Sequence, residues 1–420
     1  MFDVILKCRG DWNIEDKIFS FTMDNAEVNT KMISHLRKNL VDRGLIHHEG
    51  ILLHVRCACH VLNLIVQDGL KVKEMKSVVN NTRESVKYIR SSQGRKEQFA
   101  KMVAQAGIKC KHQPTPDVSS RWNSTYLMLE SILPFWKVFD TLQEQEPSYT
   151  FGPSADEWKM VEDICKLLKV FCHATNVISG SNYPTSNRYF FEIWGVKLIL
   201  DKQAKSSNPI IKIMVKEMKN KFHKYFMESY LTNCIPVILD PRFKMELVEL
   251  RLETYFGVDA PKHIQEVRTA INALFREYAT ELEVDVNLAS QEERNEEGVS
   301  LADDLSDWDD HVKLKKARSR NELQRYLEDD FHPRTTEFDI LKWWDVNSAR
   351  YPTLGRIARD VLAIPASSVA SESAFSTCGR VITDHRSSLA PETVEALMCY
   401  GDWIKPDSSS EGSTSHSFDS

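Results

Sequence analysis

The sequence has no long hydrophobic run. No stretch holds the roughly 18 consecutive apolar residues that a membrane-spanning helix needs, so we expect no membrane partner. The first residues, MFDVILKCRGD, carry neither a basic leader nor a small-residue cleavage site and do not predict a signal peptide. A glycine-rich phosphate loop and a nucleophile elbow are also absent. We therefore expect no cofactor and no small-molecule substrate.

Cysteine is present without a pattern. The nine cysteines are odd in number and form no framework of short spacings, which indicates a reducing, intracellular compartment. Hydrophobic residues make up 42% of the chain and charged residues 27%, which is typical of a globular protein. A length of 420 residues predicts two or three domains.

Charge is spread unevenly along the chain. The net charge of −6 argues against a protein that coats nucleic acid over its whole surface. Bases far outnumber acids between Lys71 and Lys101, whereas Arg294 is the lone base between Glu281 and Asp310. This asymmetry predicts one basic surface and one acidic linker. The alternative is a solvated helix face next to a disordered loop.

The first 70 residues predict a parallel α/β unit. Lys17–Asp24 alternates apolar residues at period two and ends in a carboxylate, as a buried strand would. A helix is expected over Val28–Leu40, a second strand over His54–Cys57 and a further helix after it. Strands that alternate with helices favour parallel pairing.

The rest of the chain is predicted to be mostly helical. Apolar residues recur at helical spacing in five segments, which are Lys71–Ala106, Trp158–Thr175, Phe190–Phe226, Leu231–Asp240 and His263–Leu282. Glu283–Asp310 is acidic and poor in large apolar residues, so we expect disorder there. Order should resume at Glu322–Leu327. Three helices are then expected, opened by Pro352, by Ser367 or Ser368, and by Pro391, before a disordered serine-rich tail.

Several side chains are candidates for chemistry, each with a plainer alternative. Asp24 could bind a ligand at a strand end, or could cap the next helix. Cys57, Cys59 and His60, with His54 nearby, could hold zinc, although thiols packed at a strand-to-helix junction suit the spacing better. Glu372 could meet another acid or face solvent. Trp122 and the pair Trp343 and Trp344 are most simply core anchors.

Seven strings of the sequence are informative when they are taken together and in order. They are FTMDNAEVN (Phe21–Asn29), HVRCACHVLNLIVQDGLK (His54–Lys71), ESVKYIRSSQGRKEQF (Glu84–Phe99), DVSSRWNSTYLML (Asp117–Leu129), LDPRFK (Leu239–Lys244), ELQRYLED (Glu322–Asp329) and FDILKWWDVNSARYPTLGRIARDVLAIPASSVASESAFSTCGRVITDHRSSLAPETVEAL (Phe338–Leu397). Together they resemble the hAT transposase superfamily, and in particular the plant zinc finger BED domain-containing proteins of the RICESLEEPER and DAYSLEEPER type. The resemblance runs from about Lys17 to Ile404, over nine tenths of the chain.

The resemblance implies an RNase H-like core that carries a DDE triad for two divalent ions. A long helical insertion interrupts that core before its last helix. Asp24 matches the second aspartate of the triad and Glu372 the glutamate, while Cys57 and His60 match a Cys-x-x-His motif. Trp122 matches a tryptophan that handles the DNA end in the family.

The departures from the family pattern predict a chain that cannot cut DNA. The first aspartate belongs tens of residues upstream of Asp24, but only 23 residues precede it here, and no BED finger is present, so we expect an N-terminally truncated relative. Mg²⁺ or Mn²⁺ would bind only if the triad were complete. Asp3, Asp11 and Asp16 are candidate substitutes, and none lies at a predicted strand end. The strand before Asp24 should also have an unpaired edge.

The predicted organisation follows from the resemblance. Residues 1–72 are a partial RNase H-like core, 73–282 a helical insertion with an RNase H-associated region at about 185–285, and 283–320 an acidic linker that ends in a basic cluster. Residues 321–405 are the hAT C-terminal dimerisation domain and 406–420 a disordered tail. The fold class is therefore α/β plus mostly α, an incomplete RNase H-like core interrupted by helices.

Two surfaces are predicted to bind partners. DNA should contact the basic stretch, with the candidates Lys87, Arg90, Arg95 and Lys96. The C-terminal domain has more large apolar residues than its own small core needs, and these should mediate a homodimer or higher oligomer. The alternative is that they only dock onto the insertion, and the two roles are compatible. The dimerisation candidates are Trp343, Trp344, Tyr351, Leu354, Ile357, Val361, Phe375 and Leu397.

The sequence as a whole predicts a transposase-derived, catalytically incompetent protein that self-associates and binds DNA. The basic cluster Lys313–Arg320 would suit a nuclear localisation signal, or the positive start of a helix. The alternatives are an active hAT-type DDE transposase or nuclease, and a gene fragment without a function.

Overall fold

A two-stranded parallel sheet forms early in the chain. In the computed structural model β1 (Phe21–Met23) pairs with β2 (His54–Arg56), and α2 (Glu27–Asp42) connects them. The Phe21 amide donates to the Leu53 carbonyl, and the Cys57 amide donates to the Met23 carbonyl, both at 2.7 Å. Parallel strands need such a crossover, because the end of the first strand and the start of the second lie at opposite ends of the sheet. The predicted α/β unit is confirmed.

The structure describes residues 2–15, 17–46, 50–110, 112–119, 121–296, 322–335, 337–381 and 389–404. The chain divides into two units, Met1–Ser367 and Ser368–Ser420. Three predictions lie outside the described residues: the basic cluster at 313–320, the end of the acidic linker, and the tail at 406–420. No helix among the described residues is both long enough and apolar enough to cross a membrane.

The N-terminal part has a small core of its own. On α2 the side chains of Met32, Leu36 and Leu40 recur at a spacing of four residues and are buried, together with Ile33 and Leu53. Helix α1 (Phe2–Asp11) covers this core with Phe2, Ile5 and Leu6. Within the described residues β2 is the strand partner of β1, which leaves one edge of β1 without a paired strand, as predicted.

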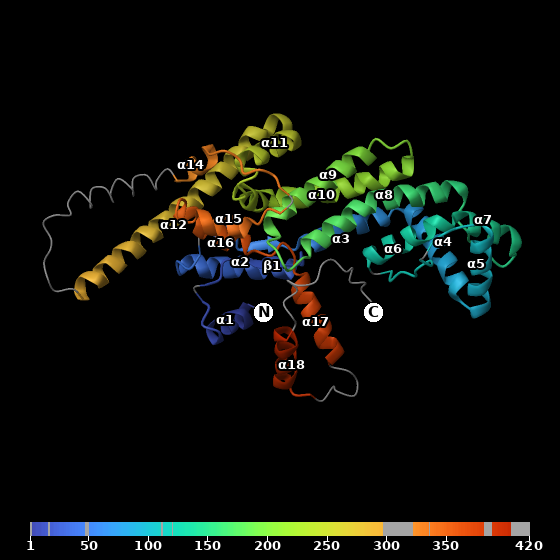
Figure 1. Ribbon diagram of the computed structural model, residues 1–420, viewed down its shortest axis with the longest axis horizontal. Coiled ribbons are helices and arrows are strands. Elements are labelled where there is room, and N and C mark those ends of the chain that lie inside the picture. Colours follow the sequence, from blue (N-terminus) through green and yellow to red (C-terminus); the bar gives the residue numbers. More distant parts are fainter. Residues whose placement is uncertain are drawn as a thin grey trace. The chain divides into compact units, whose positions relative to one another are not determined.

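Helix α3 (Ala58–Leu70) leads from the sheet into a large helical assembly (Figure 1). It packs against α10 (Pro209–Ile238), and α10 lies beside α9 (Ser186–Gln203), which in turn contacts α8 (Ala155–Ile178). Gly69 permits this close approach, because a Cβ atom at that position would lie 2.6 Å from Cγ of Met218. One continuous core runs through these helices.

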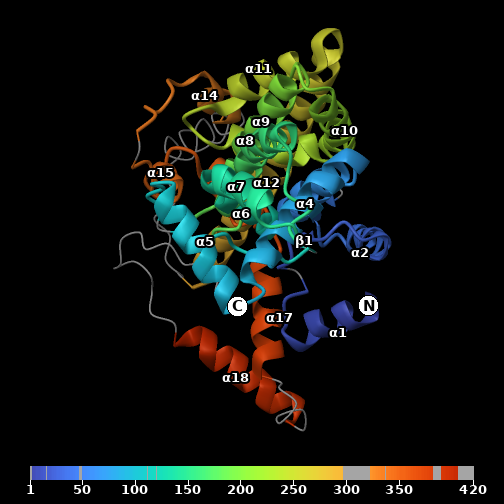
Figure 2. The ribbon, with the colours of Figure 1, turned by 90° about the vertical axis from the view of Figure 1, so that its right-hand side faces the viewer.

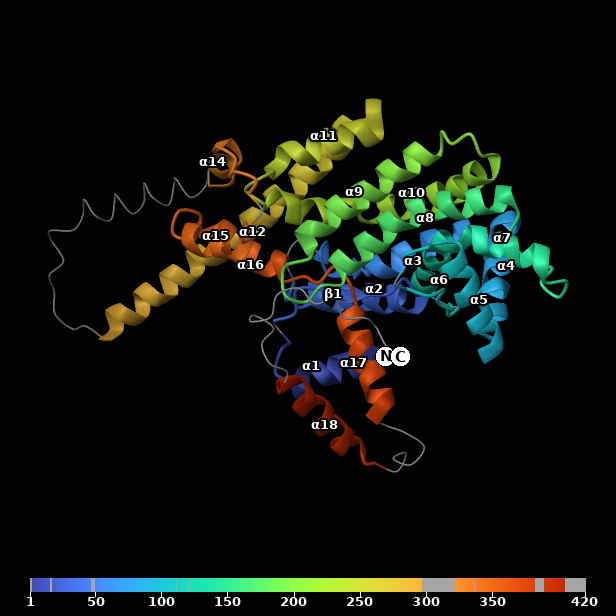
Figure 3. The same ribbon diagram turned by 45° about the vertical axis from the view of Figure 1, so that its right-hand side comes forward.

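The other helices of the insertion have the following bounds: α4 Lys73–Arg90, α5 Gln93–Gln105, α6 Trp122–Ile132, α7 Trp136–Gln145, α11 Lys244–Phe256 and α12 Ala260–Glu296, with 3-10 turns at Leu133–Phe135 and Gly257–Asp259. Figure 3 shows α8, α9 and α10 running along one another, with α4 to α7 grouped at one end of these three helices. Local signals explain two of the helix starts. Ser154 and Glu157 form a capping box at α8, and Asn208 caps α10 before Pro209.

The acidic segment is helical further than the sequence analysis predicts. We expected disorder from Glu283, but α12 continues to Glu296, so this expectation is wrong for residues 283–296. Glutamate, a good helix former, occupies four of the 14 positions from 283 to 296, and neither glycine nor proline interrupts them. Extending a helix that is already anchored by packing costs less than starting a new one, since nucleation is the unfavourable step.

The C-terminal part of the first unit docks onto the insertion. Helices α14 (Glu322–Glu328), α15 (Ile340–Asn347) and α16 (Pro352–Leu362) share the large core, and α16 contacts α10 and α12. The second unit holds α17 (Val369–Val381) and α18 (Pro391–Trp403), which pack on each other and are both labelled in Figure 2. The helices predicted from Pro352, Ser368 and Pro391 are confirmed.

Candidate functional site

Asp24 lies directly after β1, at the carboxyl end of the strand. Its Oδ1 atom accepts hydrogen bonds from the Ala26 amide (3.0 Å) and from Nδ2 of Asn29 (2.7 Å). The N-cap of α2 is Ala26, so the alternative in which Asp24 itself caps the helix is wrong in detail. The carboxylate instead holds the turn that joins the strand to the helix.

The end of β2 carries a cation next to this turn. Arg56 donates to Oδ1 of Asn25 at 3.1 Å and forms an ion pair with Glu228 of α10 at 3.0 Å. Arg56 and Glu228 could not be paired from the sequence, because they are more than 170 residues apart and neither belongs to a pattern that predicts a site. The carboxyl ends of β1 and β2 therefore carry the Asp24 carboxylate, the Asn25 amide and the Arg56 guanidinium.

The cysteine cluster is a packed junction. Cys57 is the N-cap residue of α3 and is buried, with its Sγ atom 3.6 Å from Oγ of Ser367. Cys59 is partly buried, with Sγ 3.9 Å from the Thr175 carbonyl, and His60 is partly buried one position further along. Among the described residues, no three His, Cys, Asp or Glu side chains are grouped so that they could hold a metal ion. This favours the packing interpretation over zinc.

Glu372 lies on α17 in the second unit. Its side chain is exposed, and it accepts a hydrogen bond from Oγ of Ser368 at 2.9 Å, within the first turn of the helix. Trp122 begins α6 and is 5% exposed, with its ring edge-on to Phe171 at 6.4 Å between centroids. That is the position of a core anchor. The roles of Glu372 in catalysis and of Trp122 in handling a DNA end stay predictions.

The basic candidates lie on α4 and α5. Lys87 forms an exposed ion pair with Glu84 at 2.8 Å, and Arg95 lies 3.9 Å above the ring of Tyr88. Arg90 donates to the Pro114 carbonyl at 3.2 Å and Lys96 is exposed, and neither forms an ion pair with a described residue. The two helices thus bring four cations together around one helix junction.

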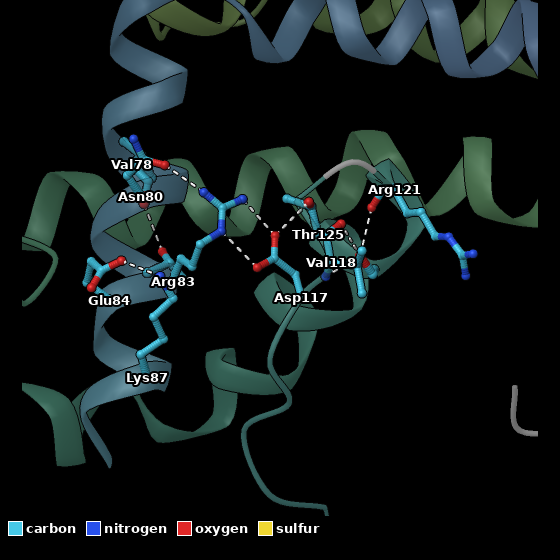
Figure 4. A network of polar contacts seen from close by, with 11 residues as sticks. Val78, Asn80, Arg83, Glu84, Lys87, Asp117, Val118, Arg121 and Thr125 are labelled. Carbon is cyan, nitrogen blue, oxygen red and sulfur yellow. Dashed lines mark hydrogen bonds and ion pairs between the residues drawn. The ribbon is translucent and has the colours of Figure 1, made fainter. Parts of the chain in front are cut away.

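A buried ion pair fixes the loop that precedes α6 (Figure 4). Arg83 of α4 donates to both carboxylate oxygens of Asp117, at 2.8 and 2.7 Å, and Thr125 donates to Oδ2 at 2.9 Å. Burial alone would raise the pKa of Asp117, but the hydrogen bonds from Arg83 and Thr125 outweigh it and lower that pKa. In the sequence, Arg83 is one of many bases between Lys71 and Lys101, and no pattern pairs it with Asp117.

Replacing Arg83 with glutamine should destabilise the fold by about 3 kcal/mol, because it leaves the Asp117 carboxylate, 1% exposed, without its cation. Chemical denaturation of the purified variant measures this. In the wild type the lowered pKa of Asp117 adds stability at neutral pH that is lost as the pH falls below about 4. Lys87→Gln, on the same helix but in an exposed pair, is the control and should cost at most about 0.5 kcal/mol. Equal losses in both variants would contradict the prediction.

The LDPRFK string forms a hub between the insertion and the C-terminal helices. Asp240 is fully buried, accepts from Arg242 at 2.9 and 2.6 Å, and receives a further bond from Asn187. Tyr326 and Trp344 donate to the carbonyls of Ile238 and Leu239, at 3.0 and 2.9 Å. Lys244, also buried, donates to the Asp329 carbonyl, and burial lowers its pKa. The string therefore has a structural role that its sequence did not reveal.

Most of the dimerisation candidates are buried within the chain. Trp344, Tyr351, Leu354, Ile357 and Val361 all belong to the large core, and Trp343 packs against it. These residues therefore dock onto the helical insertion within the same chain. The side chain of Phe375 lies outside the described part, while Leu397 is exposed on α18. A partner surface would have to use residues such as Leu397.

Family models match the chain in four consecutive segments. They are the ZBED1 RNase-like domain at residues 1–52, the ZBED1 RNase-like helical domain at 55–167, the hAT-like transposase, RNase-H fold, at 187–278 and the hAT family C-terminal dimerisation region at 322–404. The chain is also 37% identical, over 94% of its length, to zinc finger BED domain-containing protein RICESLEEPER 2 of Oryza sativa subsp. japonica. The chain belongs to the hAT transposase superfamily.

Other hAT relatives are similar over the same span. The chain is 33% identical to Putative AC transposase of Zea mays and 31% identical to zinc finger BED domain-containing protein DAYSLEEPER of Arabidopsis thaliana, over 94% and 95% of its length. It covers 57% of RICESLEEPER 2, 49% of the maize protein and 56% of DAYSLEEPER. The predicted family and its helix-rich RNase H-like fold are confirmed.

Proposed function

We propose that this hAT chain is a nuclear protein that binds DNA without sequence preference, associates with itself and does not cut DNA. The observation that carries the proposal is the group of cations on α4 and α5. Arg90 and Lys96 are exposed and not neutralised by a described carboxylate, and Lys87 and Arg95 flank them. Phosphate contacts from such a group give affinity without reading bases.

Self-association is supported by the exposed face of α18. Leu397, Tyr400 and Ile404 recur at i, i+3 and i+7, and their exposed fractions are 44%, 61% and 59%. Trp403, next to them, is 79% exposed. Large aromatic side chains dominate the energy of protein interfaces, and this helix lies within the segment that matches the dimerisation region. We therefore place the interface on α18 in preference to the buried candidates of α15 and α16.

The surroundings of Asp24 support the absence of cleavage. Phosphoryl transfer with two metal ions needs several carboxylates around ions that lie about 3.5–4 Å apart. Asp24 instead accepts two local hydrogen bonds, and the Arg56 guanidinium at the neighbouring strand end contacts Asn25. The Asp24 carboxylate is therefore engaged within its own turn.

The nuclear localisation in our proposal is supported separately. It rests on the basic cluster Lys313–Arg320 of the sequence, which would suit a nuclear localisation signal.

One experiment tests binding and cleavage together. The purified chain is titrated with two unrelated duplexes at low and high salt, and the same samples are incubated with Mg²⁺ or Mn²⁺. We expect affinity to fall steeply with salt, to be the same for both duplexes, and no strand to be cut. A sharp sequence preference would refute the binding mode. Cleavage that disappears in both Asp24→Ala and Glu372→Ala would establish the alternative, an active DDE nuclease of the kind that the name of the maize relative suggests.

A further inference from the structure

A cavity of about 180 Å³ lies beside the basic helices, between the end of α4, α5 and the segment before α6. Its floor is apolar and includes Ile89, Phe99 and Phe135, and the rings of Phe99 and Phe135 lie 5.7 Å apart at an angle of 59°. Ligand pockets for drug-sized molecules usually measure about 300–1,000 Å³. A cavity of this size can therefore accept one planar ring system and little more.

The rim of the cavity carries two cationic side chains and one histidine. Arg90, Lys96 and His112 line it, and no aspartate or glutamate is among its lining residues in the part of the chain that the structure describes. Arg90 uses one nitrogen, Nη1, for the Pro114 carbonyl, which orients the guanidinium and leaves its other donors available. An apolar floor under a rim of donors suits a flat ring attached to an anion.

We propose that this cavity binds one unstacked nucleotide of a DNA strand, with the base on the floor and its phosphate at Arg90 and Lys96. This inference rests on the proposed DNA binding. Two features favour a nucleotide within DNA: Arg90 and Lys96 belong both to the cavity and to the proposed phosphate-binding surface, and a base on an aromatic floor gains affinity whatever its identity. A base within an intact duplex stays stacked and cannot enter, so the cavity selects single-stranded or distorted segments.

The cavity would offer polar groups to one side of a bound base and apolar groups to the other. The side chains of His112 and Gln113 line the cavity from the loop before α6, where they can form hydrogen bonds with a base edge. Ala100 and Val103 of α5 close the apolar side. Since Ala100 is exposed and small, a larger side chain at this position fills the cavity without disturbing the core.

The test compares two labelled probes: a short duplex, and the same duplex interrupted by a run of unpaired thymidines. The wild-type chain should bind the interrupted probe about tenfold more tightly. Ala100→Phe should remove this preference and leave the affinity for the intact duplex unchanged. Ala104→Phe, one turn further along α5 and outside the cavity, is the matched control and should keep the preference.

A second pair of variants covers the case in which Ala100→Phe does not fold. Lys96→Gln should lose more affinity for the interrupted probe than Lys101→Gln, which removes an exposed charge of the same helix away from the cavity. If the chain binds the intact duplex but shows no preference, or if Ala100→Phe keeps the preference, the inference is wrong and the proposed function stands. If neither probe binds, both are wrong.

Discussion

Replacing Lys87, Arg90, Arg95 and Lys96 together with glutamine should lower the affinity of the chain for duplex DNA about a thousandfold at about 0.1 M salt. Each cation that neutralises a phosphate releases counterions and adds about 0.9 to the slope of log affinity against log salt. Four such contacts add about 3.6, so the slope itself should flatten by that amount in the variant. Fluorescence anisotropy at several salt concentrations measures both quantities.

The existing contacts of these cations do not prevent DNA binding. The exposed pair of Lys87 with Glu84 is worth little in water and is easily exchanged for a phosphate. A matched control removes four exposed lysines of α9, α10 and the turn between them, namely Lys202, Lys205, Lys212 and Lys216, and so changes the net charge equally. If the control loses as much affinity as the α4–α5 variant, DNA responds to overall charge and not to this surface.

Replacing Tyr400, Trp403 and Ile404 with serine should convert a self-associated chain into a monomer. In a twofold interface each substitution acts twice, and a buried aromatic anchor commonly contributes about 2 kcal/mol or more. The three together should raise the dissociation constant by at least about a thousandfold. Sedimentation velocity over a range of concentrations measures the effect. The fold should be retained, since these side chains are mostly exposed within the chain.

The control for this prediction removes apolar surface elsewhere. Leu198, Leu250 and Val258 are exposed on α9, on α11 and in the turn before α12, and their exposed fractions resemble those on α18. Their replacement with serine should leave the oligomeric state unchanged. A wild-type chain that sediments as a monomer at all concentrations would refute the proposed self-association.

The sequence was sufficient to predict features that depend on local pattern. Alternation at period two predicts a strand before Asp24, and a broad apolar stripe predicts the helix from Pro352; both elements are present. The strand is shorter than predicted, Phe21–Met23 in place of Lys17–Asp24, and it is only partly buried. The position of Asp24 at the end of this strand could be predicted as well, because the alternating pattern stops at Met23. The family resemblance then added Glu372 as a partner of this aspartate, as an expectation only.

Features that depend on distant contacts could not be predicted in this way. Arg83 and Asp117 are 34 residues apart, and Trp344 is 105 residues from the Leu239 carbonyl that it contacts. No periodicity relates such pairs, because the intervening chain can fold in many ways. The same limit explains why the apolar residues of α15 and α16 suggested a partner surface. Composition shows that a residue will be buried, but not which surface buries it.

The hub around Leu239 has a consequence for synthesis of the protein. The carbonyls of Ile238 and Leu239 receive hydrogen bonds from side chains that leave the ribosome 88 and 105 residues later. Until then, the end of α10 and the apolar surface beneath α14 to α16 stay open to solvent, chaperones and proteases. Completion of the first unit is therefore delayed until nearly the whole of it has been translated. Nascent chains that stop before residue 322 cannot close this core and are expected to be degraded.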